Sequence, residues 1–278
     1  MAAGSLTPAT SARFSVVLRG IPVLLYHALA RADEGEGRGR EKKYWVSLRQ
    51  FQGQLEQIRR AGRQVALLGE LWAQPGAPDE DKPPIVLTFD DGHRSNYDVA
   101  FPALLEAGVR ADFFVNTSTV GQPSYLEWRQ ILEMQRTGMA FHSHSHDHVA
   151  LSRLSIQELE VQLGESKRRL EDRLGCSVDY LSVPYGFVNR QVFVVARRLG
   201  YRGVCTSRGW PAHPSAFQIN RVAVYRHTGL REFRSLVVGD PFCYAFRSAR
   251  AALLYVPKQV LLRLDPARLG VRVREEQG

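Results

Sequence analysis

Two short stretches of this sequence concentrate side chains that can bind metals. Asp90 and Asp91 are adjacent and follow the apolar run 83–87, and four histidines stand within residues 142–148. Imidazole is the commonest metal ligand in proteins, and two histidines with one carboxylate form the ligand set of many open catalytic sites. The two stretches therefore indicate a metal site, with a solvated turn and a chance histidine run as the alternative.

The spacing of the histidines does not decide which of them would bind. The pairs His142/His146, His144/His148 and His142/His144 all remain open on spacing alone. The two aspartates are easier to separate, because neighbouring residues on a strand point to opposite sides. We therefore expect the two carboxylates to have different roles.

Strand and helix patterns alternate along the chain. Apolar runs at 21–27, 65–68, 83–87, 111–115, 139–141, 178–183 and 203–205 predict strands, and helical spacing predicts helices at 47–62, 93–108, 126–135, 155–174 and 191–199. Such alternation is typical of βα units around a parallel sheet or barrel.

Candidate functional residues recur where the predicted strands end. His27 ends the first strand, the two aspartates follow the strand 83–87, the histidine run follows 139–141, and Pro184-Tyr185-Gly186 follows 178–183. In parallel α/β folds the chemistry lies at the carboxyl ends of the strands. This shared position predicts one common site.

Composition limits the class of protein. The chain has 278 residues with 37 Lys and Arg against 28 Asp and Glu, a net charge of +9. This excess suits a polyanionic partner or a membrane surface. No nucleic-acid-binding signature accompanies it, so we expect no nucleic acid partner. Three widely spaced cysteines, no leader pattern and no long apolar run favour a cytoplasmic protein that could associate with a membrane surface.

The motifs together resemble those of a known family. Thr88-Phe89-Asp90-Asp91-Gly92, His142-Ser143-His144-Ser145-His146 and Pro184-Tyr185-Gly186 are similar to three motifs of the polysaccharide deacetylases, that is, carbohydrate esterase family 4 or the NodB-homology domain. The opening Pro22-Val23-Leu24-Leu25-Tyr26-His27 looks like the poly-N-acetylglucosamine deacetylase branch. The resemblance implies a distorted (β/α) barrel of seven or eight strands.

The resemblance also implies roles for individual residues. Asp91, His142 and His146 would bind a divalent metal, most often Zn²⁺, with Co²⁺, Ni²⁺ or Fe²⁺ as alternatives. Asp90 would be the general base, and the backbone N–H of Tyr185 would contact the substrate oxyanion. A metal in such a site can lower the pKa of bound water to about 7.

Two departures from the family pattern affect the expected site. Ser182 stands where the third motif usually has an arginine, and the Leu-x-His of the last motif has no clear match. Arg221 could replace the missing arginine, although a surface arginine is the expectation. His27 is the better candidate for the general acid, because His227 lacks the motif around it; a buried histidine with satisfied hydrogen bonds is the alternative.

The predicted organisation has three parts. Residues 1–19 form a disordered N-terminal segment, 20–240 a single deacetylase domain, and 241–278 a basic C-terminal helical extension that could touch a membrane surface. The predicted function is metal-dependent removal of the N-acetyl group from an amino-sugar substrate. A non-catalytic glycan-binding relative, or an amidohydrolase or deformylase acting on another substrate, remains the alternative.

Overall fold

The structure is a computed structural model that describes residues 20–31, 39–72, 84–250 and 253. The expected disorder of residues 1–19, most of the loop expected at 74–84, and most of the extension 241–278 lie outside the described residues. Among the described helices, none combines the length and the apolar character that crossing a membrane requires.

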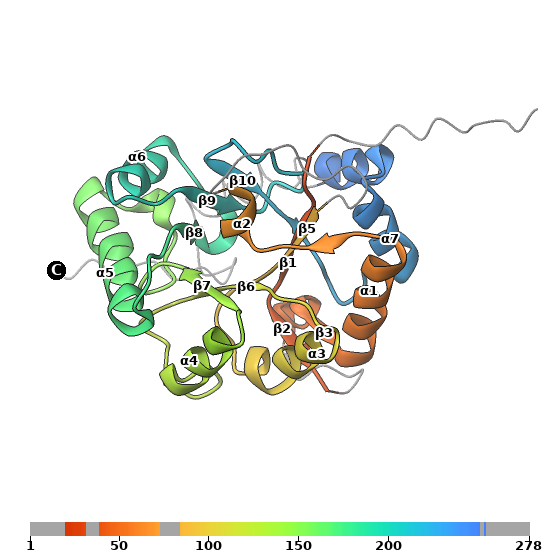
Figure 1. The fold of residues 1–278 in the computed structure, drawn as a ribbon. Helices are drawn as coiled ribbons and strands as arrows, with labels where there is room; N and C mark the ends of the chain where they lie inside the picture. The colour runs from red at the N-terminus through yellow and green to blue at the C-terminus, as the bar shows by residue number, and fades with distance from the viewer. Residues whose placement is uncertain (1–19, 32–38, 73–83, 251–252, 254–278) are drawn as a thin grey trace, which may run out of the picture.

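A parallel barrel forms the centre of the molecule (Figure 1). Its strands are, in chain order, β1 (Val23–Tyr26), β5 (Pro84–Phe89), β6 (Asp112–Val115), β7 (Ala140–Ser143), β8 (Tyr180–Ser182), β9 (Gly203–Thr206), β10 (Gln218–Asn220) and β11 (Val222–Ala223). They pair in the order β10-β9-β8-β7-β6-β5-β1-β11. The short β4 (Gln64–Val65) pairs with β5, whereas β2 (Ala28–Ala30) and β3 (Trp45–Ser47) form a separate pair.

The barrel closes through one continuous segment, residues 218–223. The first half of this segment, β10, pairs with β9, and the second half, β11, pairs with β1. Only Arg221 separates the two halves. The ring of strand pairings therefore returns to its beginning at this residue, and the predicted distorted barrel is confirmed.

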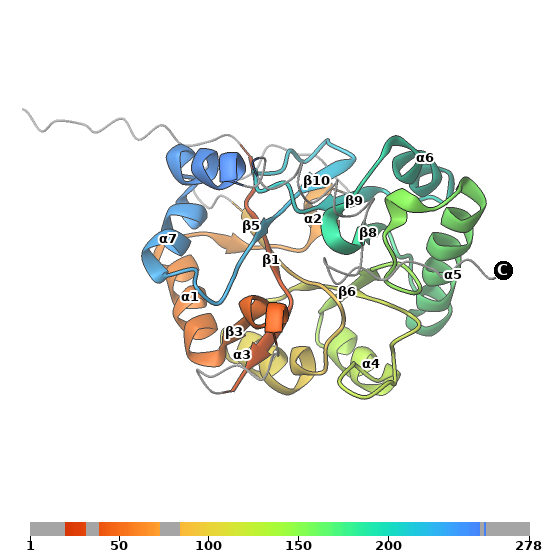
Figure 2. The ribbon, with the colours of Figure 1, turned by 180° about the vertical axis from the view of Figure 1, so that it is seen from behind.

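Helices surround the barrel (Figures 1 and 2). They are α1 (Leu48–Arg60), α2 (Leu68–Trp72), α3 (Phe101–Glu106), α4 (Trp128–Arg136), α5 (Ile156–Leu174), α6 (Arg190–Arg198) and α7 (Leu230–Val238), with the short turns η1 (Gly39–Tyr44), η2 (Asn96–Ala100), η3 (Leu151–Arg153) and η4 (Pro184–Gly186). The predicted N-caps are confirmed: Ser47 Oγ accepts from Gln50 N, and Ser155 forms a capping box with Glu158.

The interior of the barrel is packed and closed at one end. Phe114, Tyr180, Cys205 and Ile219 fill it, and α2 adds Leu68 and Trp72 to the same cluster. The backbone of Leu68 bonds to the first residues of two strands, donating to the Asp112 carboxylate at 3.1 Å and accepting from the Tyr180 hydroxyl at 3.3 Å. The amino end of the barrel is thus covered by α2, which leaves the carboxyl end for the site.

Candidate metal and catalytic site

The two aspartates diverge where β5 ends. Asp90 stays in the sheet, because its N–H donates to the Tyr26 carbonyl at 3.0 Å. Asp91 has φ 73° and Gly92 has φ 65°, so the chain turns sharply after Asp90. A Cβ on Gly92 would lie 2.9 Å from Val115 Cγ1, so the turn requires glycine. The geometry therefore gives the two carboxylates different surroundings, as the sequence predicts.

Asp90 is held by a buried arginine. Nη1 of Arg221 donates to Asp90 Oδ1 at 2.8 Å and Nη2 donates to Oδ2 at 2.7 Å, a bidentate pair. The Ser182 hydroxyl also donates to Oδ2 at 2.9 Å. Arg221 is 0% exposed, so the expectation of a surface arginine is wrong. Ser182 stands at the position where the motif usually has an arginine. The guanidinium of Arg221, which lies in the segment 218–223 that closes the barrel, contacts Asp90 instead.

The electrostatic surroundings keep Asp90 ionised. Burial by itself would raise the pKa of this carboxyl. The charge and hydrogen bonds of Arg221 outweigh burial and hold the pKa below its ordinary value. Among the described residues, Asp90 Oδ1 accepts one side-chain hydrogen bond and Oδ2 accepts two, so Oδ1 has more lone-pair capacity for a further donor.

Asp91 faces two histidines on the other side of the turn. Its Oδ1 lies 3.2 Å from His144 Nε2 and 3.3 Å from His148 Nε2. All three ligand atoms lie within 4.8 Å of one another. We call Asp91, His144 and His148 the Asp–His cluster.

Outer partners fix which nitrogen of each histidine faces Asp91. His144 Nδ1 lies 2.8 Å from the Ser182 carbonyl, which only accepts, so Nδ1 carries the proton. His148 Nδ1 lies 3.2 Å from the Tyr185 hydroxyl. Such partners orient ligand histidines and leave Nε2 free to coordinate. The donor set, two imidazoles and one carboxylate, therefore fits a divalent metal.

The predicted pair His142 and His146 does not join this cluster. His142 Nε2 lies 3.0 Å from Asp112 Oδ1, inside the barrel. His146 Nδ1 lies 2.7 Å from Thr117 Oγ1. In the structure, the histidines that face Asp91 are therefore His144 and His148 rather than the predicted His142 and His146.

The length of β7 explains why His144 and His148, rather than His142 and His146, face Asp91. The sequence predicts a strand that ends at Phe141, but β7 continues to Ser143. Side chains two apart on a strand point to the same side, so His142 lies inside the barrel one step below His144. The turn that follows has φ 65° at Ser145 and φ 54° at His148, and it returns His148 toward Asp91.

Backbone strain is concentrated around the site. Among the described non-glycine residues with positive φ, four belong to the site or its supports, namely Asp91, Ser145, His148 and Tyr185, and the fifth is Ser124. Such conformations cost about 1–3 kcal/mol each and persist only where the surrounding structure imposes them. This clustering is typical of functional sites.

His27 and Tyr185 both lie at this end of the barrel. The Tyr185 ring packs 4.7 Å from that of His148, and its hydroxyl contacts the same histidine. The His27 ring lies 4.5 Å from that of Tyr44, and among the described residues its buried Nδ1 has no hydrogen-bond partner. Burial lowers the pKa of His27, although the charges of Asp91 and Asp90 oppose this.

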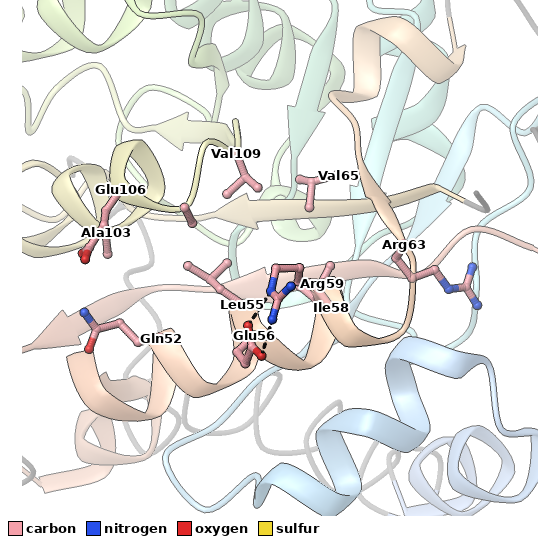
Figure 3. A pocket seen from close by; sticks show the side chains of 11 residues that line it. Gln52, Leu55, Glu56, Ile58, Arg59, Arg63, Val65, Ala103, Glu106 and Val109 are labelled. Atoms are coloured by element: carbon pink, nitrogen blue, oxygen red, sulfur yellow. Dashed lines mark hydrogen bonds and ion pairs between the residues drawn. The ribbon is translucent and has the colours of Figure 1, made fainter. Parts of the chain in front are cut away.

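A hollow that is separate from these residues lies on the outside of the barrel. It has a volume of about 350 Å³ and lies between α1 and α3, where Leu55, Ile58, Val65 and Val109 face one another (Figure 3). Glu56 at its edge pairs with Arg59 on the same helix. None of the candidate site residues lines this hollow.

Comparison with known proteins shows which family the chain resembles. Residues 77–204 match the family model described as polysaccharide deacetylase. The chain is 26% identical over 209 residues to YxkH of Bacillus subtilis, a protein named as a polysaccharide deacetylase by provisional assignment. The match covers 73% of this chain and 71% of YxkH. It is 25% identical over 175 residues to the poly-β-1,6-N-acetyl-D-glucosamine N-deacetylase of Staphylococcus aureus (strain MRSA252), covering 58% of this chain and 60% of that protein.

Solved structures agree with the barrel. The deacetylase PplD of Streptococcus pyogenes has a TM-score of 0.71 and 24% sequence identity, with 80% of this chain and 99% of that chain covered. At this identity the likeness supports the fold alone. The matched motifs, the relatives and the barrel agree, and residues 77–204 are similar to the polysaccharide deacetylase family.

Proposed function

We propose that this protein removes the N-acetyl group from an amino-sugar substrate by metal-dependent hydrolysis. The observation that carries the proposal is the juxtaposition of an ionised, arginine-held Asp90 with the Asp–His cluster at the open end of the barrel. The name of the Staphylococcus aureus relative, a poly-β-1,6-N-acetyl-D-glucosamine N-deacetylase, supports an N-acetylated glycan as the substrate class.

Asp91, His144 and His148 are the proposed metal ligands, and Zn²⁺ is the proposed metal because of its preference for histidine and carboxylate ligands. When bound, such a metal supplies Lewis acidity, which polarises a carbonyl and lowers the pKa of water. Asp90 is the proposed general base. It can take a proton from the attacking water because Arg221 keeps it ionised and fixed in orientation.

Two further roles remain proposals. Tyr185 orients His148 through its hydroxyl, and its backbone N–H is the proposed donor to the substrate oxyanion. His27 is the proposed acid for the departing amine. The charges of Asp90 and Asp91 favour a proton on its ring, whereas burial disfavours it, so protonation would have to occur during the reaction cycle.

Arg221 weakens the argument for a non-catalytic relative. The non-catalytic alternative is suggested by the absence of the motif arginine that supports the base and by the absence of the last-motif histidine. Here the base keeps a bidentate guanidinium partner, supplied from a different strand. An ionised aspartate beside the Asp–His cluster fits catalysis better than it fits glycan binding alone.

Acetate release tests the function directly. The zinc-loaded protein is incubated with N-acetylglucosamine oligosaccharides, and acetate is measured enzymatically. We expect Asp90→Asn to keep its metal and to lose about 10²–10⁴-fold in turnover, the usual contribution of a general base. Absence of acetate from all N-acetylated glycans, with metal bound, would refute the proposal.

The place of the protein in the cell is also a proposal. A cytoplasmic location is supported by three free cysteines, Cys176, Cys205 and Cys243. A peripheral membrane contact is supported by Phe242 and Phe246, which are 84% and 70% exposed near basic residues of the helical segment 241–250. Fractionation of cells and binding to anionic vesicles test the two proposals separately.

A further inference from the structure

A basic hollow lies beside the candidate site. It has a volume of about 510 Å³, and every residue that lines it is basic: Lys42, Lys43, Arg226 and His227. The two lysines lie in the last turn of η1, and the other two residues follow β11. Two segments that are far apart in the sequence thus bring at least three positive charges to one place.

The two walls of the hollow are fixed to each other. The Arg226 N–H donates to the Lys43 carbonyl at 2.9 Å. The Lys43 ammonium lies 4.6 Å above the Tyr44 ring, and the His227 ring stacks on Tyr225 with centroids 5.3 Å apart. The backbones of the two walls, the Lys43 ammonium and the His227 ring are therefore held in place before any ligand arrives, although the mutual repulsion of the cations opposes this arrangement.

The same frame joins the hollow to the catalytic end of the barrel. Tyr44 follows Lys43 directly, and its ring lies 4.5 Å from His27 and 5.7 Å from Tyr225. Burial and, after it, the charge of Asp91 raise the pKa of Tyr44, which places this ring within electrostatic reach of the Asp–His cluster. A glycan with its acetamide at the cluster could therefore extend over Tyr44 into the hollow.

We propose that the hollow binds a phosphate group carried by the amino-sugar substrate. This inference rests on the proposed function, which it makes more specific. Two lysines and an arginine supply three positive charges, and the His227 ring lies beside them. A phosphate ester carries up to two negative charges and several acceptor oxygens, so it balances this set better than a single carboxylate does. The phosphate can be a monoester on a sugar or a diphosphate that links the sugar to a carrier.

Matched substrates test the inference. Four N-acetylglucosamine oligosaccharides of equal length are compared: neutral, with a terminal carboxylate, with a terminal phosphate monoester, and with a terminal diphosphate ester. We expect kcat/KM for acetate release to be at least tenfold higher for a phosphorylated form than for the neutral and carboxylate forms. Comparing the monoester with the diphosphate identifies the source of the phosphate. Equal values for all four forms would overturn the inference and leave the proposed function intact.

Charge reversal locates the effect. In the variant Lys42→Glu/Lys43→Glu, the ratio of kcat/KM for phosphorylated over neutral substrate should fall to about one. The control Arg136→Glu/Arg190→Glu makes the same change of charge at exposed positions on α4 and α6, and it should keep the ratio. A ratio that survives in the lysine variant, or that falls equally in the control, would overturn the hollow as the binding site.

A binding measurement separates this inference from the proposed function. Asp90→Asn is titrated with the phosphorylated oligosaccharide by calorimetry, with and without the lysine reversal. Binding that requires the two lysines supports the hollow even if the wild-type protein releases no acetate, in which case only the proposed function fails. Lysine-dependent binding to anionic phospholipid vesicles, without preference among the oligosaccharides, would overturn the inference in favour of a lipid surface.

Discussion

Replacing Arg221 by methionine is the most informative single perturbation, because it removes the partner of the proposed base and keeps most of the side-chain volume. In the wild type, this guanidinium donates to both oxygens of Asp90 and to the Thr88 and Ser182 hydroxyls, at 2.7–3.2 Å. All four groups are buried. The substitution therefore leaves a carboxylate and two hydroxyls inside the barrel without their main partner.

The expected loss of stability is large. Removing one member of a buried ion pair typically costs about 3–5 kcal/mol, since the remaining charge is uncompensated. The surface pair Arg202–Asp179, at 3.6 Å and with Arg202 45% exposed, provides the control. Arg202→Met should cost about 0–1 kcal/mol. Urea denaturation of the two variants, monitored by circular dichroism, measures both values.

The pH dependence of activity should change as well. In the wild type, Asp90 has a pKa below its ordinary value, so the base is ionised throughout the neutral and mildly acidic range. Without the guanidinium, burial dominates and raises this pKa. The acidic limb of kcat/KM against pH should therefore move to higher pH in Arg221→Met, with a loss of about 10²–10⁴-fold at neutral pH.

The depressed pKa of Asp90 also makes the stability of the fold depend on pH. A carboxyl whose folded pKa is depressed stabilises the protein above its unfolded pKa of about 3.9, and this contribution disappears as the pH falls through the folded pKa. If the Arg221→Met variant is unstable, Arg221→Lys can replace it, because lysine keeps the positive charge but cannot form the bidentate pair with Asp90. Combining the Arg221 substitution with Asp90→Asn measures the coupling free energy between the two side chains. A coupling below about 0.5 kcal/mol together with an unmoved acidic limb would refute the reasoning.

Three more predictions concern the metal and the turn that carries it. Alanine at any position of the Asp–His cluster should abolish bound zinc measured by mass spectrometry, whereas His142→Ala should keep it; loss of zinc from His142→Ala would instead support the ligands expected from the sequence. Tyr185→Phe removes a partner of a ligand histidine and should weaken zinc affinity about 10–100-fold by competition with a chelator; an unchanged affinity would show that the hydroxyl does not position the ligand. Gly92→Ala should destabilise the fold more than Gly108→Ala, because both have φ near +65° but only Gly92 lacks room for a Cβ; equal melting temperatures would contradict this.

Local patterns in the sequence were sufficient to predict most elements. The strand–helix alternation, the capping serines Ser47 and Ser155 and the helix-ending glycines act over a few residues, so they can be recognised without the fold. The family motifs also located the end of the barrel where the site lies. The barrel and the similarity of residues 77–204 to the polysaccharide deacetylase family agree with those predictions.

Only the tertiary structure decided which histidines face Asp91. The run 142–148 offers two equivalent four-residue spacings, and a difference of two residues in the end of β7 selects between them. This end depends on pairing with β6, in which Phe114 lies opposite His142 and Val115 opposite Ser143. Strand length set by a neighbouring strand is not contained in the local pattern.

The partner of Asp90 likewise depended on the closed fold. The sequence determined that an arginine was missing at position 182 and that Asp90 needed a partner, because a buried charge is costly alone. It could not determine that Arg221 supplies it, since the two residues are 131 positions apart. They meet only because residues 218–223 pair with both β9 and β1, and this closure of the barrel carries the guanidinium into its interior.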